Sequence, residues 1–171
     1  MHVVNIVISG TMGQKINLDS INHSLDCFTY NPEFYHGGYL QLHNYTATIY
    51  QSGKYIIPGV KLFEEIPKLF QEMKCVLQDI LDTSLLQYPQ IRNIVASAEL
   101  GYPVDLTSVC STLFSNGYQP DYEPETFPGL IIHLDQGTIN LFSSGKYILL
   151  GTTQEKDLIQ LNDYFLSLVS N

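Results

Sequence analysis

The segments that decide the fold are "YQSGKYIIPG", residues 50–59, and "FSSGKYILLG", residues 142–151, which spell nearly the same word twice. The similarity continues upstream in the same register. Residues 30–59 align with residues 122–151 without a gap, and 12 of these 30 positions are identical. A match of this length indicates a duplication rather than a chance repeat of one short word.

A second pair of matching words extends the duplication toward the N-terminus. "NIV" occurs at residues 5–7 and again at 93–95, an offset of 88 residues instead of 92, so the second copy carries four extra residues. The chain is therefore a tandem repeat, with predicted domains at residues 1–88 and 89–171. Helical repeat arrays usually have three or more shorter units, whereas two long units suggest a pseudo-symmetric pair that shares one core.

The composition is that of a folded but acidic protein. Of 171 residues, 44% are hydrophobic and 12% aromatic, which is enough to bury a core. There is no apolar run of membrane-spanning length and no charged and apolar leader, so we expect a soluble, intracellular protein. Seventeen acidic and eight basic residues give a net charge of -9, with the larger excess in the second half. Such a chain repels nucleic acid at long range.

The hydrophobic pattern of each unit predicts a strand, a short helix, an antiparallel meander of three strands and a long helix, which is an α+β pattern. In the first unit the short helix falls in "NLDSINHSLDCF", before the turn "YNPEF". The remaining elements of this unit are strands at 3–9, 39–43, 46–50 and 54–58 and a helix at 66–81. The second unit repeats the order, with a strand at 93–98, a helix at 106–114, three strands ending by 151 and a helix at 155–169.

Several predicted strands are apolar on both faces. An antiparallel sheet with helices on one face and water on the other should alternate apolar with polar residues. Here the second face carries a large apolar set, which predicts a surface that a partner covers. The residues expected on it are Val7, Tyr35, Tyr50, Ile56, Val95, Phe127, Phe142, Ile148 and Leu150.

The words "NIV", "YNPEF", "SGK" and "YEPETFPGLI" together resemble the core of the TATA-box-binding protein family, over nearly the whole chain. The resemblance implies a saddle of two pseudo-symmetric repeats, with one curved antiparallel sheet and four helices on its convex face. It also implies a general transcription initiation factor, nuclear in a eukaryote and cytoplasmic in an archaeon. Such a factor binds A/T-rich promoter DNA in the minor groove, bends it with side-chain wedges, and recruits transcription factor B and RNA polymerase.

The family's DNA-contacting positions are carried over one by one. The wedge positions fall on Tyr35 and Tyr50 in the first repeat, and on Phe127 and Phe142 in the second. Asparagines that read minor-groove acceptors are present as Asn5 and Asn93, since an amide donor suits A·T edges. Apolar contacts to sugars and bases fall on Val7, Val95, Ile56 and Ile148.

The departures from the family weaken the expected grip on DNA. Threonines that accompany the two asparagines are replaced by Pro58 and Leu150. Basic residues that hold phosphates in the family fall on Glu33, Phe34, Gln41 and His133. Phosphate contacts therefore rest on Lys54, Lys61 and Lys146, with Arg92 as a further candidate. Because each lost phosphate contact lowers the salt dependence of binding, we expect DNA affinity that is weak or dependent on a partner.

Protein partners are implied by two further segments. In the family, the loop equivalent to "YEPETFPG" is gripped by transcription factor B, which assigns this contact to Glu123, Glu125 and Thr126, the last replacing a leucine. The long helix of the first repeat is basic in typical members, but here it carries Glu64, Glu65, Glu72, Asp79 and Asp82 against two lysines. We therefore expect this helix not to bind partners that require a cationic surface.

Two readings of function stay open. The first is a divergent promoter-recognition factor, and the alternative is a protein-binding module that has lost DNA and uses its apolar concave face for a protein partner or a homodimer. Each site residue also has an ordinary explanation: sheet packing for the aromatics, turn hydrogen bonds for the asparagines, and solvated loop acids for the glutamates. No enzyme, cofactor or metal site is predicted, because SGK lacks the preceding glycine of a phosphate loop and no nucleophile or ligand spacing occurs.

Overall fold

A computed structural model of the chain describes residues 1–169, which form two compact units. The N-terminal unit comprises residues 5–92. The C-terminal unit comprises the described residues from Asn93 onward, together with Met1–Val4. The first four residues thus pack with the second copy of the repeat.

Both units are built from antiparallel strands and two α-helices each. The sheet of the N-terminal unit has the order β2-β3-β4-β5-β1, and that of the C-terminal unit β6-β9-β8-β7. The first set of elements is β1 (His2–Thr11), α1 (Leu18–Ser24), β2 (Phe28–Thr29), β3 (Gly37–Gln41), β4 (Thr46–Tyr50), β5 (Lys54–Val60), α2 (Glu65–Leu77) and a 3₁₀ turn (Thr83–Leu85). The second set is β6 (Gln90–Glu99), α3 (Leu106–Ser115), β7 (Leu130–Leu134), β8 (Gly137–Leu141), β9 (Lys146–Thr152) and α4 (Glu155–Val169).

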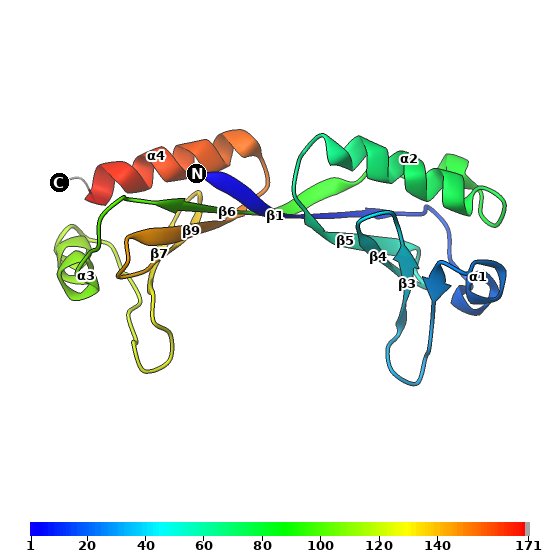
Figure 1. Cartoon of the computed structure of the whole chain (residues 1–171), viewed down its shortest axis with the longest axis horizontal. Coiled ribbons are helices and arrows are strands. Elements are labelled where there is room, and N and C mark those ends of the chain that lie inside the picture. The colour runs from blue at the N-terminus through cyan, green and yellow to red at the C-terminus, as the bar shows by residue number, and fades with distance from the viewer. Residues whose placement is uncertain (170–171) are drawn as a thin grey trace. The chain divides into compact units, whose positions relative to one another are not determined.

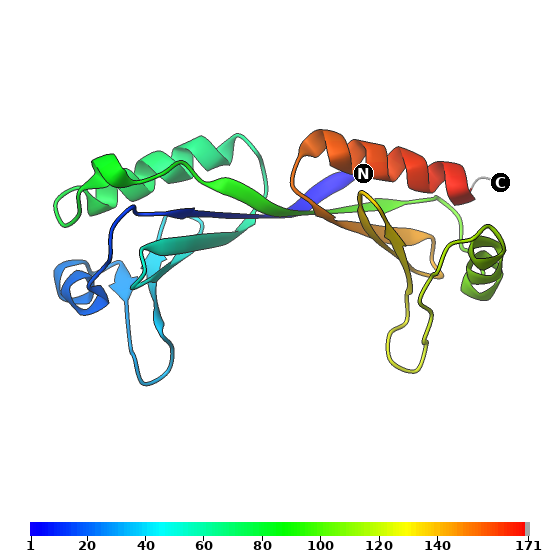
Figure 2. The same ribbon diagram turned by 180° about the vertical axis from the view of Figure 1, so that it is seen from behind.

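The two helices of each unit lie on the same face of its sheet. Figure 1 shows α1 and α2 on one side of the N-terminal sheet and α3 and α4 on one side of the C-terminal sheet, and the reverse view in Figure 2 agrees. Side-chain burial follows this division, since Tyr55 and Ile57 in β5 are buried beneath the helices while Ile56 between them is 36% exposed. Among residues 1–169 no helix covers the opposite side, which we call the helix-free face.

The turn glycine of the repeated word explains why SGK occurs twice. Gly53 and Gly145 adopt φ of +85° and +83° at the turns that lead into β5 and β9. A Cβ at either position would collide with a backbone carbonyl oxygen, that of Gln14 or of Tyr102. Only glycine combines this left-handed backbone with so close an approach. The geometry of the two hairpins thus requires the glycine of SGK in both copies.

The tyrosine that follows SGK is an internal anchor in both copies. Tyr55 and Tyr147 are buried, and their hydroxyls donate to the carbonyl of Gln87 (3.0 Å) and to Oδ1 of Asn162 (2.9 Å). Burial raises the pKa of Tyr55 well above its ordinary value. Since strand side chains alternate between faces, anchoring the tyrosine inward turns the next isoleucine outward.

The predicted helix at 66–81 is wrong at its C-terminal end. The structure ends α2 at Leu77, and the chain continues through a turn to Asp82. The side chain of Asp82 accepts a hydrogen bond from the N–H of Ser84 and begins the short 3₁₀ turn. Asp82 itself is extended, as a helix N-cap requires, so this short turn is separate from α2.

Candidate nucleic-acid interface

Asn5 and Asn93 occupy equivalent places on the helix-free faces of their units. Their neighbours Ile6 and Ile94 are buried toward the helices, and the asparagines are half-exposed on the other side. Oδ1 of Asn5 accepts a hydrogen bond from the N–H of Gly59 at 2.8 Å, and Oδ1 of Asn93 accepts one from the N–H of Gly151 at 2.9 Å. Each asparagine is thus tied to the last residue of the repeated word.

These hydrogen bonds fix which way each asparagine amide points. A backbone N–H can only donate, so the atom facing it must be the side-chain oxygen, and the NH₂ group is directed elsewhere. The NH₂ group of each asparagine is therefore turned away from its glycine. Gly59 and Gly151 have φ of +86° and +95°, a left-handed backbone that glycine adopts readily. Each unit therefore presents one oriented amide donor.

Apolar side chains surround these donors. Val7 and Val95 follow on the same strands, and Ile56 and Ile148 lie opposite Ser9 and Ser97 on the neighbouring strands. All four are half-exposed or exposed. Pro58 and Leu150 continue the apolar surface beside the asparagines. The structure thus places the predicted apolar contacts on the face that the strand pattern indicated.

The four predicted wedge residues form two pairs, one in each unit. The rings of Tyr35 and Tyr50, the tyrosine pair, are 6.3 Å apart at an interplanar angle of 61°. Those of Phe127 and Phe142, the phenylalanine pair, are 5.8 Å apart at 63°. All four rings are half-buried, and none lies in the core beneath the helices. The shared edge-to-face geometry shows that the duplication preserved the arrangement of the rings.

A glycine sets the position of each aromatic pair. A Cβ on Gly37 would come within 3.1 Å of both tyrosine rings, and one on Gly129 would come within 3.1 Å of both phenylalanine rings. Such distances are shorter than an ordinary carbon contact. The missing side chain lets both rings of a pair lie close to the strand backbone.

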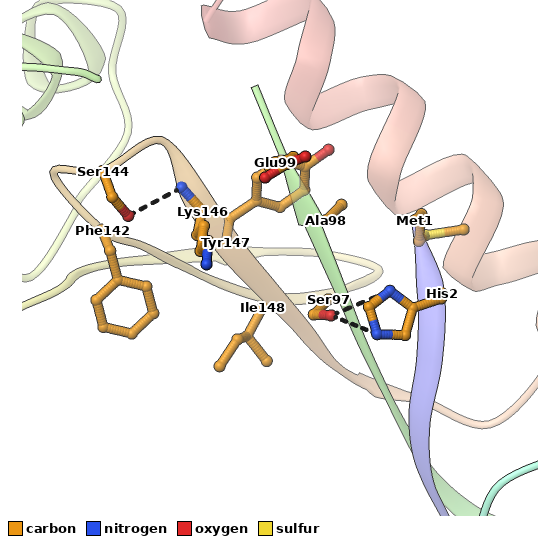
Figure 3. A pocket seen from close by; sticks show the side chains of 10 residues that line it. All are labelled: Met1, His2, Ser97, Ala98, Glu99, Phe142, Ser144, Lys146, Tyr147 and Ile148. Carbon is orange, nitrogen blue, oxygen red and sulfur yellow. Dashed lines mark hydrogen bonds between the residues drawn. The ribbon is translucent and has the colours of Figure 1, made fainter. Parts of the chain in front are cut away.

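Each unit has a hollow bordered by its wedge residue and a basic side chain. In the C-terminal unit the hollow has a volume of about 660 Å³, and Figure 3 shows Phe142, Ile148, Lys146 and His2 around it. The hydroxyl of Ser97 lies 3.1 Å from Nε2 of His2. Glu99 lines the same hollow, so this hollow carries both acidic and basic side chains.

The corresponding hollow of the N-terminal unit has a volume of about 350 Å³ and contains a permanent cation. Nε of Arg92 donates a hydrogen bond to Oγ of Ser9 at 2.7 Å, and Lys54, Tyr50 and Ile56 also line the hollow. Ser9 and Ser97 are equivalent in the repeat, so one is paired with an arginine and the other with a histidine. Lys61 is not part of this group and lies in a separate surface hollow with Pro58 and Gly59.

The sequence pattern gave no sign of His2. It lies in the C-terminal hollow because residues 1–4 pack with the second copy, a long-range relation that no local motif encodes. Arg92 was predicted only as a further candidate for phosphate contact. Its hydrogen bond to Ser9 joins residues 83 positions apart.

The loop assigned to transcription factor B is a tight turn with exposed side chains. The N–H groups of Thr126 and Phe127 both donate to the carbonyl of Glu123 at 2.9 Å. Glu123, Glu125 and Thr126 are exposed, and the loop begins next to the bridge between Asp121 and Ile131. The turn presents two carboxylates and anchors Phe127 at its base.

Two acids of α2 are held by the turn between β3 and β4. The hydroxyl of Tyr45 donates to Glu65 at 2.6 Å, and this hydrogen bond lowers the pKa of the carboxyl group. The N–H of His43 donates to Glu72, also at 2.6 Å. Glu65 and Glu72 therefore hold α2 against this turn, in addition to contributing negative charge.

The comparisons with known proteins agree with this geometry. The family model described as "Transcription factor TFIID (or TATA-binding protein, TBP)" matches residues 1–80 and again residues 88–171. The chain belongs to this family. As the TBP family consists of transcription factors, the prediction that the chain is not an enzyme is confirmed.

Curated relatives and a solved structure extend the match over the chain. The TATA-box-binding protein of Pyrodictium occultum is 34% identical over 93% of this chain and 80% of its own length. TATA-box-binding protein F of Halobacterium salinarum is 32% identical over 95% of this chain and 91% of its own length. The structure of Methanococcus jannaschii TBP is similar with a TM-score of 0.82 and 29% identity, covering 99% of this chain and 97% of that one.

The structural match confirms the predicted α+β fold of the TBP type. Within residues 1–169, no helix is long and apolar enough to cross a membrane. The same described residues contain no group of three His, Cys, Asp or Glu side chains that could hold a metal ion.

Proposed function

We propose that the chain is a general transcription initiation factor that binds A/T-rich promoter DNA from the minor groove and bends it. The observation that carries this proposal is the pair of oriented amide donors, Asn5 and Asn93, each fixed by a glycine N–H on a helix-free face. Family membership supports the same role.

The donors fit the chemistry of the A·T minor groove. Every A·T pair presents only acceptors there, N3 of adenine and O2 of thymine, whereas guanine adds an N2 amino donor. The side-chain oxygen of each asparagine is hydrogen-bonded to a glycine N–H, so the NH₂ group is already oriented in the free protein. It therefore loses little rotational freedom on binding DNA. A guanine amino group at the same place would meet a donor instead of an acceptor. The asparagines therefore favour A·T pairs.

The aromatic pairs supply the apolar surface that a deformed duplex needs. Minor-groove proteins insert apolar side chains between base pairs and exchange lost base stacking for contact with the protein. The phenylalanine pair and the tyrosine pair are already positioned by Gly129 and Gly37. Val7, Val95 and the isoleucines Ile56 and Ile148 cover the sugars and base edges between them.

The weak point of the interface is its charge. Lys54 and Arg92 line one hollow and Lys146 lines the other, while Glu99 also borders the second. With a net charge of -9, long-range attraction to phosphate is lacking. We propose that transcription factor B, docked on Glu123, Glu125 and Thr126, supplies additional cations and that RNA polymerase follows.

Equilibrium fluorescence anisotropy on three labelled duplexes tests this function. One contains an A·T core, the second has inosine·cytosine pairs in the same positions, and the third has guanine·cytosine pairs. Inosine lacks the guanine N2 amino group, so an inosine·cytosine pair resembles an A·T pair in the minor groove and a guanine·cytosine pair in the major groove. We expect binding to the first two at low salt and a loss on the third, with tighter binding when factor B is added. Absence of binding to all three, with and without factor B, would refute the proposal.

The alternative is a protein-binding module whose helix-free face binds another polypeptide or a second copy of the chain. The observation in its favour is the loss of basic and hydroxyl groups, with Pro58, Leu150 and Glu33 in place of residues that serve DNA in the family. Light scattering coupled to size-exclusion chromatography distinguishes the two. A stable dimer that A·T duplex does not dissociate would support the module and oppose promoter binding.

A further inference from the structure

The two aromatic pairs share a geometry but differ in chemistry. The hydroxyls of Tyr35 and Tyr50 are hydrogen-bonded to each other at 2.9 Å. The phenylalanine pair has no polar atom on either ring. One copy of the duplication thus presents a purely hydrocarbon wedge, and the other presents a hydrogen-bonded pair of phenols.

Further rings contact the tyrosine pair, whereas among residues 1–169 the rings of the phenylalanine pair stack only on each other. Tyr39 stacks on Tyr35 with centroids 5.8 Å apart and planes 12° from parallel, and His36 lies 5.4 Å from the ring of Tyr50. In the second copy the residues equivalent to His36 and Tyr39 are Pro128 and Ile131. The tyrosine pair is therefore held within a polar aromatic cluster.

Insertion between base pairs affects the two pairs differently. A phenylalanine ring loses only water contacts when a base step opens around it. Two tyrosine hydroxyls bonded to each other satisfy one donor and one acceptor, and they leave a second O–H group and further lone pairs without a partner. Inside a base stack, where water is excluded, these groups stay unsatisfied at a cost in free energy.

We infer that the two pairs distinguish the two ends of the bound DNA: the phenylalanine pair opens a base step, whereas the tyrosine pair keeps its hydroxyl hydrogen bond and rests against the groove edge. This inference rests on the proposed function. Because pyrimidine–purine steps such as TA unstack easily and A-tracts are stiff, the phenylalanine pair selects the end with the TA step. The tyrosine hydroxyls thereby determine the orientation of the protein on its site.

Energy transfer measures this orientation directly. Cys75 on α2 of the N-terminal unit is exposed and takes a donor dye, in a background where the half-buried Cys27 and Cys110 are changed to serine. The acceptor dye is placed on one or the other end of an A/T-rich duplex with a TA step at one end and an A-tract at the other. For the parent protein we expect an orientation ratio of about fivefold or more, since one net hydrogen bond corresponds to roughly three- to tenfold in an equilibrium.

Three variants separate the hydroxyl effect from general damage. Y35F/Y50F removes the hydroxyl pair, and we expect the ratio to fall toward one. The exchange variant Y35F/Y50F/F127Y/F142Y moves the pair to the other unit, and we expect the preferred orientation to reverse. The matched control Y39F removes a hydroxyl of the same cluster that does not belong to the pair, and we expect an unchanged ratio.

Fluorescence of 2-aminopurine placed at each end step reports which step opens. We expect a strong increase at the step under the phenylalanine pair and a small one under the tyrosine pair. Equal increases in the parent protein, or an exchange variant that keeps the parent orientation, would overturn the inference while leaving promoter binding intact. Failure of the parent protein to bind any A·T duplex would instead refute the proposed function itself.

Discussion

Asn93→Asp is the sharpest perturbation of the proposed interface, because aspartate keeps the shape of asparagine and changes only what faces the DNA. The N–H of Gly151 lies 2.9 Å from Oδ1 of Asn93, and an aspartate oxygen accepts the same hydrogen bond. The half-exposed position leaves the new charge in contact with water in the free protein. We therefore expect the free energy of unfolding to stay within about 0.5 kcal/mol of the parent value.

The same change should be severe for DNA binding. Loss of the NH₂ donor leaves a minor-groove acceptor without a partner, at a cost of about 1–3 kcal/mol. The carboxylate now faces that acceptor and the surrounding phosphates, which adds about 1 kcal/mol even at the dielectric constant of water. Together these contributions amount to about 2–4 kcal/mol, or roughly a 30- to 900-fold loss of affinity.

Anisotropy with the A·T duplex measures the affinity, and urea unfolding measures the stability. Asn5→Asp is the matched change in the other unit, where Gly59 provides the N–H group at 2.8 Å. Asn93→Ala serves as the contrast, since it removes both the DNA donor and the acceptor of the glycine N–H and should reduce binding and stability together. Unchanged affinity of the aspartate variant for the A·T duplex would refute the role assigned to the amide.

Three further predictions concern the anchor, the charge and the acidic helix. Tyr55→Phe should lower the free energy of unfolding by about 0.5–1.5 kcal/mol in urea titrations, because the hydrogen bond from the buried ring's hydroxyl to the carbonyl of Gln87 is lost; a loss below 0.3 kcal/mol would contradict the anchoring role. Arg92→Gln should reduce the slope of log affinity against log salt by about one, whereas Lys156→Gln on the helix-bearing face should leave it unchanged. The pKa of Glu65 is lowered in the folded state, so its stabilising contribution is present above the ordinary carboxyl pKa and is lost as pH falls through the folded value. Tyr45→Phe should therefore show a smaller loss of stability on acidification than the parent protein, and equal losses would count against the hydrogen bond.

The arrangement of strands could be predicted because it depends on local patterns and on repetition. The alternation of apolar residues in β5 placed Ile56 on the face opposite the helices, where the structure has it. Gly53 marked a turn through a backbone requirement that operates within a few residues. The identity of the face was therefore available from the sequence, whereas the DNA-contacting roles of its residues remain predictions.

Long-range polar contacts could not be predicted in the same way. The hydrogen bond from Gly59 to Asn5 joins residues 54 positions apart, and the one between Tyr35 and Tyr50 depends on side-chain rotation within a half-buried pair. The place of His2 depends on residues 1–4 packing with the second copy. Hydrophobic periodicity carries no information on such contacts, because it specifies which face a residue occupies and not which polar atom it meets.

Under the proposed function, residues that are the same in both units offer the same chemical groups to DNA, so these shared residues carry no directional information. In this chain the amide donors are shared in this way, since Asn5 and Asn93 have the same glycine partner and nearly the same distance. The surrounding positions differ between the two units. Arg92 donates a hydrogen bond to Ser9 in one hollow, whereas His2 is hydrogen-bonded to Ser97 in the other. A promoter must be read in one direction to start transcription in that direction. Under the proposed function, the shared asparagines select A·T pairs but not a direction. Directional information must then come from residues where the two copies differ, and the hydroxyl pair of Tyr35 and Tyr50 is such a difference at a predicted wedge position.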